Sequence, residues 1–142
     1  MKKLFKTVFL LTLFAASLQA KVADVLIAAP SVPLEALSAQ ELESVFLGTQ
    51  TNWPDGTRIT VGYVTKEPDR MEAFLQAHMG QSLKRYQRYW VRRVFSGYGT
   101  APRLFKNENE ALEFVKSTPG AIIFVPSQKI EKLSELNFAA LD

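Results

Sequence analysis

The chain has 142 residues, of which 47% are hydrophobic and 22% charged, which is the composition of a globular protein. It contains no cysteine, which excludes disulfide bonds, thiol nucleophiles and cysteine-ligated zinc, and its single histidine excludes a multi-histidine metal site within one chain. The formal net charge of +3 suggests nucleic-acid binding. The positions of the charges along the sequence argue against this hypothesis.

The first twenty residues have the three parts of a secretory signal peptide. Lys2, Lys3 and Lys6 precede an uncharged stretch, residues 7–18, and the small residue Ala20 ends the segment. A membrane anchor is the alternative, but the uncharged stretch is shorter than the roughly 20 apolar residues that a spanning helix needs. We therefore expect cleavage after Ala20 and export to the periplasm.

Removal of this signal peptide, residues 1–20, takes away three of the 17 basic residues, and the remaining 14 equal the 14 acidic residues. The exported chain, residues 21–142, then carries no net charge and is a poor candidate for nucleic-acid binding. The absence of cysteine is compatible with the periplasm, where disulfides are permitted but not required. The length of this segment fits one domain around one hydrophobic core.

The first half of the exported chain is predicted to contain two strands and a helix between them. Residues 22–29 form an apolar run that is short enough for a buried strand. Ser38 and Glu41 have the spacing of a capping box, which opens a helix. Residues 58–64 alternate in hydrophobicity and are predicted to form the second strand.

Two consecutive helices are predicted next. Pro68 suits the first turn of a helix that carries apolar residues at spacings of three and four and ends at Gly80, and Ser82 can cap the following helix. The apolar face of that following helix is predicted to comprise Leu83, Tyr86, Trp90 and Val94. Its other face holds the cations Lys84, Arg85, Arg88, Arg92 and Arg93. The spacing of the aromatic residues favours a solvated basic face, with a docking surface as the alternative interpretation.

The last third of the chain continues the alternation of strands and helices. Residues 95–103 have the composition of a loop, and Asn107 and Glu110 are a cap pair for a fourth helix. Residues 121–125 form an apolar strand of the kind that is buried on both faces, and residues 130–141 are expected to form a short helix and an edge strand. The predicted fold class is α/β, with a small, mostly central mixed sheet flanked by helices.

No combination of residues in the sequence indicates catalysis. His78 lies on the predicted apolar face of its helix without a second histidine or a cysteine, which favours a core or boundary position. The sequence lacks a GxSxG elbow, a Walker loop and a GxGxxG motif. The paired carboxylates fall where helices begin, where they complement the helix dipole. We therefore expect neither an enzyme nor a bound metal or cofactor.

The order of five segments resembles the PstS-like family, the phosphate-binding proteins of ABC importers. The segments are LSAQELESVFLGTQTNWPDG (37–56), RITVGYV (58–64), DRMEAFLQ (69–76), YWVRRVFSG (89–97) and NENEALEFVKSTPGAIIFV (107–125). The resemblance implies a type 2 periplasmic-binding-protein fold, of which a chain of this length is a single lobe. It also implies that the ligand is phosphate or another small oxyanion and that the partner is an inner-membrane transporter. The ligand-binding residues expected on this basis are Thr65, Lys66, Asp69, Arg70, Gly97 and Arg103.

The chain departs from the family where the family holds its anion. Pro68 removes an amide donor, and Glu67 and Asp69 place negative charges at the start of the helix. These departures motivate an alternative function, a protein-interaction or sensory accessory module that keeps the fold without the ligand. The partner-binding residues of this alternative are Lys84, Arg85, Arg88 and Arg92. A homodimer that recreates a cleft from two single lobes is a variant of this hypothesis.

Overall fold

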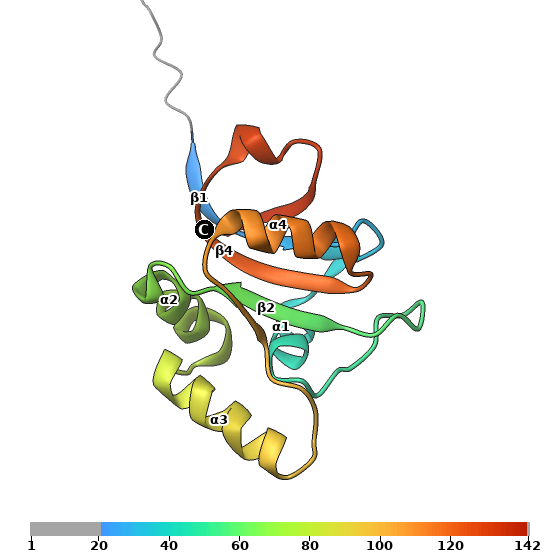
Figure 1. Cartoon of the computed structure of the whole chain (residues 1–142), viewed down its shortest axis with the longest axis vertical. Coiled ribbons are helices and arrows are strands. Elements are labelled where there is room, and N and C mark those ends of the chain that lie inside the picture. Colours follow the sequence, from blue (N-terminus) through green and yellow to red (C-terminus); the bar gives the residue numbers. More distant parts are fainter. Residues whose placement is uncertain (1–20, 142) are drawn as a thin grey trace, which may run out of the picture.

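The computed structural model describes residues 21–141, which form a five-stranded mixed sheet with helices on both faces (Figure 1). The predicted signal peptide, residues 1–20, lies outside the described residues. The elements are β1 (Val22–Ala28), η1 (Leu34–Ala36), α1 (Ala39–Phe46), β2 (Thr60–Val64), α2 (Pro68–Met79), α3 (Leu83–Phe95), β3 (Arg103–Phe105), α4 (Glu108–Ser117), β4 (Ala121–Lys129), η2 (Ile130–Leu133) and β5 (Asn137–Leu141). The α/β class and the mixed sheet are confirmed.

The strand order is β3-β2-β4-β1-β5. Strand β2 runs parallel to both β3 and β4, whereas β1 runs antiparallel to β4 and β5. The register pairs Gly62 with Arg103 on one side of β2 and Val61 with Ile122 on the other. Strand β5 lies at one edge of the sheet, as the sequence predicts for the C-terminal segment.

Two apolar cores lie on opposite faces of the sheet, because successive side chains of each strand point to opposite faces. In β4, Ile122 and Phe124 face a core shared with α1, α2 and α3, while Ile123 and Val125 face a core shared with α4. All four side chains are at most 2% exposed, which confirms that this strand is buried on both faces. The sheet is thus the middle of three layers (Figure 1).

Helix starts follow their predicted caps. The hydroxyl of Ser38 accepts from the amide of Glu41 at 3.1 Å, and the Glu41 carboxylate accepts from the Ser38 amide at 3.0 Å, so the capping box is confirmed. Ser82 and Asn107 likewise accept from the backbone three residues later and start α3 and α4. His78 is half-buried with its ring centroid 4.9 Å from that of Phe74, which confirms the boundary position.

Four predicted details differ from the structure. The second strand starts at Thr60 instead of residue 58, because Arg58 forms an isolated antiparallel bridge with Asn52. Strand β4 continues past residue 125 to Lys129, and the segment expected to be a loop, residues 95–103, runs into the short strand β3. Val94, expected on the inner face of α3, is 45% exposed. Within residues 21–141, no helix has the length and hydrophobicity that crossing a membrane requires.

Candidate functional site

The carboxyl ends of β2 and β4 lie side by side, at the edge of the sheet where open α/β folds usually hold ligands. The connection after β2 leads to β3 on one side, whereas the connection after β4 leads towards β5 on the other side. Ligands usually bind where neighbouring connections diverge in this way. Four of the residues predicted to bind a ligand lie here, where β2 leads into α2: Thr65, Lys66, Asp69 and Arg70.

The polar side chains at the carboxyl ends of β2 and β4 form hydrogen bonds and an ion pair within the protein. One carboxylate oxygen of Asp24 accepts from the Ser127 amide at 3.0 Å, and its other oxygen lies 3.4 Å from Nη1 of Arg70. The hydroxyl of Ser127 donates to Glu67 at 3.0 Å. The hydroxyl of Thr65 donates to the carbonyl of Phe105 at 3.2 Å. Of the predicted ligand donors, the Thr65 hydroxyl and the Arg70 guanidinium are therefore engaged, whereas Lys66 is exposed and belongs to no ion pair among residues 21–141.

The backbone of this network is also constrained. Glu67 and Ser127 have φ values of 53° and 51° and are the non-glycine residues with positive φ in the part of the chain that the structure describes. Such conformations cost on the order of 1–2 kcal/mol each. Because these two side chains are hydrogen-bonded to each other, the strained turns after β2 and near the end of β4 are joined. The network therefore engages these side chains with one another.

The opposite end of β2 borders a cavity of about 500 Å³. Two arginines, Arg58 and Arg103, line this cavity together with polar side chains of Gln50, Thr51, Thr60 and Thr100. The lining includes no aspartate or glutamate, and neither arginine belongs to an ion pair among residues 21–141. Its apolar part comes from Val45, Ile59, Val61, Trp90 and Phe114.

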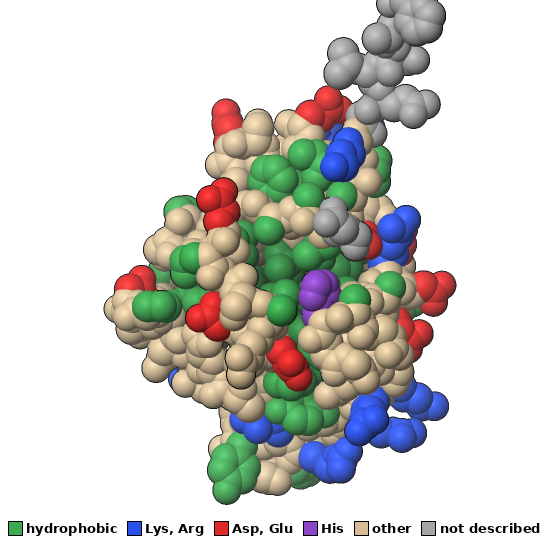
Figure 2. Space-filling model, turned by 180° about the vertical axis from the view of Figure 1, so that it is seen from behind, with side chains coloured by type: hydrophobic (Ala, Val, Ile, Leu, Met, Phe, Trp, Pro, Cys, Tyr) green, Lys and Arg blue, Asp and Glu red, His purple; other side chains and the backbone are tan. Residues whose placement is uncertain are grey.

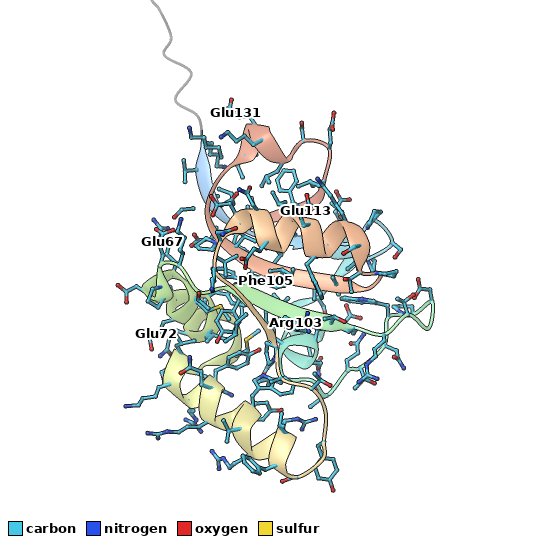
Figure 3. The ribbon with its side chains drawn as sticks, in the orientation of Figure 1. Glu67, Glu72, Arg103, Phe105, Glu113 and Glu131 are labelled. Atoms are coloured by element: carbon cyan, nitrogen blue, oxygen red, sulfur yellow. The ribbon has the colours of Figure 1, made fainter. Side chains whose placement is uncertain are left out.

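Arg103 is held over an aromatic ring at this cavity. Its guanidinium carbon lies 5.2 Å from the centroid of the Phe114 ring, which is a cation–π contact. Strand β3 places Arg103 beside Gly62, where an added Cβ would lie 2.9 Å from the Arg103 carbonyl oxygen. Glycine at position 62 thus permits the close approach of β3. Figure 3 shows Arg103 beside β2 and Glu67 at the start of α2, well apart in the molecule.

The wall of the cavity at the end of α1 is held by α3. The last turn of a helix leaves carbonyls without intrahelical partners. Here three successive carbonyls accept from α3: Phe46 from the Tyr86 hydroxyl at 2.7 Å, Leu47 from the Tyr89 hydroxyl, and Gly48 from Nη2 of Arg93 at 3.2 Å. The inner face of α3 therefore fixes the segment that leads into the cavity lining.

Two glycines permit close approaches beside the cavity, Gly48 in its lining and Gly120 behind the backbone of Arg58. Gly48 has a φ of 71°, and a Cβ there would lie 2.4 Å from the ring of Trp90, so only glycine lets this turn pack on the indole. Gly120 has a φ of 80°, and a Cβ there would lie 2.1 Å from the carbonyl oxygen of Arg58. The Gly120 carbonyl accepts from Nε1 of the buried Trp53 at 2.9 Å. These contacts set the position of the Arg58 backbone.

Burial changes the acidity of two tyrosines, Tyr63 and Tyr86. Burial raises the pKa of Tyr63 and raises the pKa of Tyr86 further, since it penalises the phenolate form. Tyr86 is 1% exposed, and its hydroxyl donates a hydrogen bond to the Phe46 carbonyl. Both side chains are therefore neutral at physiological pH, and neither belongs to the lining of the cavity.

The structure does not gather the six predicted ligand-binding residues at one place. Thr65, Lys66, Asp69 and Arg70 lie at the carboxyl end of β2, while Arg103 lies at the cavity beside the amino end. Gly97 is exposed in the turn after α3 and lines neither place. Sequence reasoning missed Arg58, and the signal that could have found it is its position directly before the alternating strand.

The four predicted partner-binding residues, Lys84, Arg85, Arg88 and Arg92, are all exposed on the outer face of α3. Figure 2 shows this cluster as the gathering of basic side chains at the lower right. Arg93 is half-buried, with its guanidinium carbon within 6 Å of the ring centroids of Tyr89 and Trp90. The spacing thus predicted the buried aromatic residues Tyr86 and Trp90 and the four exposed cations. It was wrong for Arg93, which packs against the aromatic face.

Among residues 21–141 no group of three or more histidine, cysteine, aspartate or glutamate side chains is placed to hold a metal ion. No protein-family model, no curated protein and no solved structure matches the chain. Its function has to be inferred from its own residues and their geometry.

Proposed function

We propose that the chain is an exported binding protein for phosphate or another small oxyanion, of the single-lobe periplasmic-binding-protein type, and that the anion binds in the cavity lined by Arg58 and Arg103. The observation that carries this proposal is a cavity with two arginines and no carboxylate in its lining. Support for the family comes from the PstS-like segments, which supply α1, β2, most of α2, part of α3, α4 and the first part of β4 in that order.

The chemistry of the lining suits an oxyanion. A guanidinium presents several N–H donors in a planar fork that matches two oxygens of a phosphate or carboxylate. The hydroxyls of Thr51, Thr60 and Thr100 add neutral donors. Because Arg103 already stacks on Phe114, less side-chain freedom is lost when it binds an anion.

The size of the cavity favours more than a bare phosphate. A volume of about 500 Å³ lies within the range of about 300–1,000 Å³ that small-molecule sites occupy. Phosphate would leave room for water, whereas a phosphate monoester could rest its carbon skeleton on Val61 and Trp90. Oxyanions with a small organic part are therefore included in the proposed ligand class.

The test is isothermal titration of the purified protein with inorganic phosphate and with glycerol phosphate at low salt. We expect saturable heat with at least one of them, and a loss of affinity of about tenfold or more in Arg103→Ala and in Arg58→Ala. The matched control is Arg70→Ala, because Arg70 is paired with Asp24 at the other end of β2. Its affinity should equal that of the wild type.

Two results would contradict the proposal. One is the absence of saturable heat and of any ligand-induced rise in Tm at millimolar concentrations of both ligands. The other is a loss of binding in Arg70→Ala that Arg103→Ala does not share, which would assign the anion to the start of α2.

Export is tested separately. Mass spectrometry of the protein recovered from the periplasm of the expressing cell should give a chain that begins at Lys21. A chain that keeps residues 1–20 and stays with the cells would contradict the export proposal and leave the anion proposal untouched.

A further inference from the structure

A groove of about 440 Å³ runs between α3 and β3, next to the arginine cavity, with which it shares the lining residues Trp90 and Ala101. Its lining is almost wholly apolar and includes Tyr63, Val91, Val94, Phe95, Pro102 and Leu104. The exposed fractions are 56% for Val91, 89% for Phe95 and 60% for Leu104. Of the six large hydrophobic side chains left exposed among residues 21–141, five lie on α3, on the turn that follows it or on β3.

The edge of the sheet adds free backbone groups to this groove. Strand β3 lies at the end of the strand order opposite β5. The carbonyl of Phe105 accepts from the Thr65 amide, so the polar backbone groups of Phe105 face β2. Backbone groups of successive residues in a strand point to opposite sides, so those of Leu104 face away from the sheet. The groove therefore offers an apolar floor beside an open strand edge.

The helix that forms the other wall of the groove carries only positive charge. Helix α3 has five cations and no acidic residue. Lys84, Arg85, Arg88 and Arg92 are exposed, and none of them belongs to an ion pair among the described residues. Val91 lies between Arg88 and Arg92 in a shallow depression that continues the groove across the helix. The apolar groove is thus bordered by cations.

We infer that the groove between α3 and β3 is a docking site for an acidic, extended segment of a partner protein. The segment would pair with the free backbone groups of Leu104, place apolar side chains in the groove, and set its carboxylates opposite Arg88 and Arg92. This is strand addition at a sheet edge, combined with charge complementarity. The inference does not depend on anion binding at the Arg58–Arg103 cavity.

Other occupants fit the surface less well. A second copy of the chain docked face to face would place one basic α3 against another, because a two-fold contact joins the same patch on both subunits. An anionic bilayer would satisfy the cations but would leave the N–H and C=O of Leu104 without partners in an apolar surrounding, which is costly. A polypeptide satisfies the cations, the apolar side chains and the strand edge together.

The test starts with a displayed library of random peptides of about a dozen residues, selected on the full protein. We expect the enriched sequences to be acidic, with apolar residues at alternate positions. A synthetic peptide of the enriched sequence should lose affinity about tenfold or more in Leu104→Glu and in the double variant Arg88→Glu/Arg92→Glu. Hydrogen exchange of the Leu104 amide should slow when the peptide is bound.

The controls are matched in exposure and charge. Val22→Glu alters the sixth exposed hydrophobic side chain, on β1 and outside the groove, and should leave peptide affinity unchanged. Lys129→Glu/Lys132→Glu makes the same charge change as the α3 variant at exposed sites away from it and should have little effect. Because all these side chains are exposed, the variants should fold, which circular dichroism checks.

Four outcomes would overturn the inference. They are a selection that enriches no peptide, enriched peptides without acidic character, affinity unchanged in Leu104→Glu, and an amide of Leu104 that stays unprotected in the complex. Vesicles of phosphatidylcholine with phosphatidylglycerol that bind the wild type, but not the α3 double variant, would assign the surface to a membrane instead. A dimer in sedimentation that Leu104→Glu dissociates would assign it to a second copy.

Discussion

The two ends of β2 differ in what their charged side chains do. At the carboxyl end, Arg70 forms an ion pair with Asp24, and Ser127 donates hydrogen bonds to both Asp24 and Glu67. At the amino end, Arg58 and Arg103 face a cavity whose lining contains no carboxylate. The topology of the sheet favours a ligand at the carboxyl end, where Lys66 is the cation without an ion pair among the described residues. The two arginines that share a cavity lie at the amino end. Availability of donors, and not their number, separates a structural network from a binding site.

The largest loss of stability is expected for Gly120→Ala, beside the amino end of β2. A Cβ at this position would lie 2.1 Å from the backbone oxygen of Arg58, and the φ of 80° is strained for alanine. We expect the free energy of unfolding in urea to fall by about 3 kcal/mol. Gly56→Ala is the control, since Gly56 has a φ of 88° with nothing within 4 Å, and it should cost only about 1 kcal/mol. Equal losses in the two variants would contradict the steric role of Gly120.

The next effect concerns the carbonyls at the end of α1. Tyr86→Phe leaves the Phe46 carbonyl without its donor and should lower the free energy of unfolding by about 2 kcal/mol at neutral pH. Tyr98→Phe, at a tyrosine that is 70% exposed, should leave this value unchanged. Denaturant titrations of the three proteins provide the measurement, and a loss shared by Tyr98→Phe would refute the assignment.

The same tyrosine gives a pH dependence with a definite sign. Because burial raises the pKa of Tyr86 in the folded state, the unfolded chain releases this proton first, at its ordinary value near 10. Wild-type stability should therefore decrease as the pH rises above about 10, and part of the difference from Tyr86→Phe should disappear there. A difference that stays constant across this range would contradict the assignment.

A smaller effect is expected at the carboxyl end. Arg70 is 52% exposed in its pair with Asp24, so Arg70→Met should cost less than about 1 kcal/mol of unfolding free energy, and less still at high salt. A double-mutant cycle with Asp24→Asn measures the pair itself. Lys116→Met, which breaks a more exposed pair with Glu113, should cost less than Arg70→Met. A large, salt-independent loss would contradict the interpretation of Arg70 and Asp24 as a weak, partly exposed ion pair.

The smallest expected effect concerns the pKa of Asp55, which lies near the amino end of β2 in the sequence. The backbone amide of Thr57 donates to Asp55 at 2.8 Å and lowers the pKa of that carboxyl. This contribution to stability is present above the ordinary pKa and is lost as the pH falls through the lowered one. Titration followed by NMR should give the same Asp55 pKa in the wild type and in Arg58→Ala. A rise in the variant would mean that Arg58 is partnered by Asp55 and is less available to a ligand.

The sequence predicted those features that local contacts determine. The capping box of Ser38 and Glu41 and the division of α3 into two faces depend on residues a few positions apart, so they can be read from spacing. Strand β3 was missed because three residues cannot display an alternation and its extended form comes from pairing with β2. The exposure of Val94 could not be predicted for a similar reason: it depends on which other elements cover the last turn of α3, and that is set by tertiary packing.

The candidate site was predictable only in part. The segment from Thr65 to Arg70 was located correctly at the end of β2, but the partners of Arg70 and Glu67, namely Asp24 and Ser127, are far away in the sequence. Arg58 and Arg103 meet at one cavity because β3 returns beside β2, a contact that no local pattern contains. Pairings of this kind come from topology and not from propensity.

The three bonds from α3 to the end of α1 have a consequence for regulation. They join the helix that carries the proposed docking surface to a segment that lines the arginine cavity, so the two proposed sites are connected through these hydrogen bonds. A partner that displaces α3 when it docks must also displace the carbonyls of Phe46, Leu47 and Gly48. If an anion and such a partner both bind as proposed, thermodynamic linkage requires each to change the affinity of the other by the same factor, through the hydrogen bonds of Tyr86, Tyr89 and Arg93.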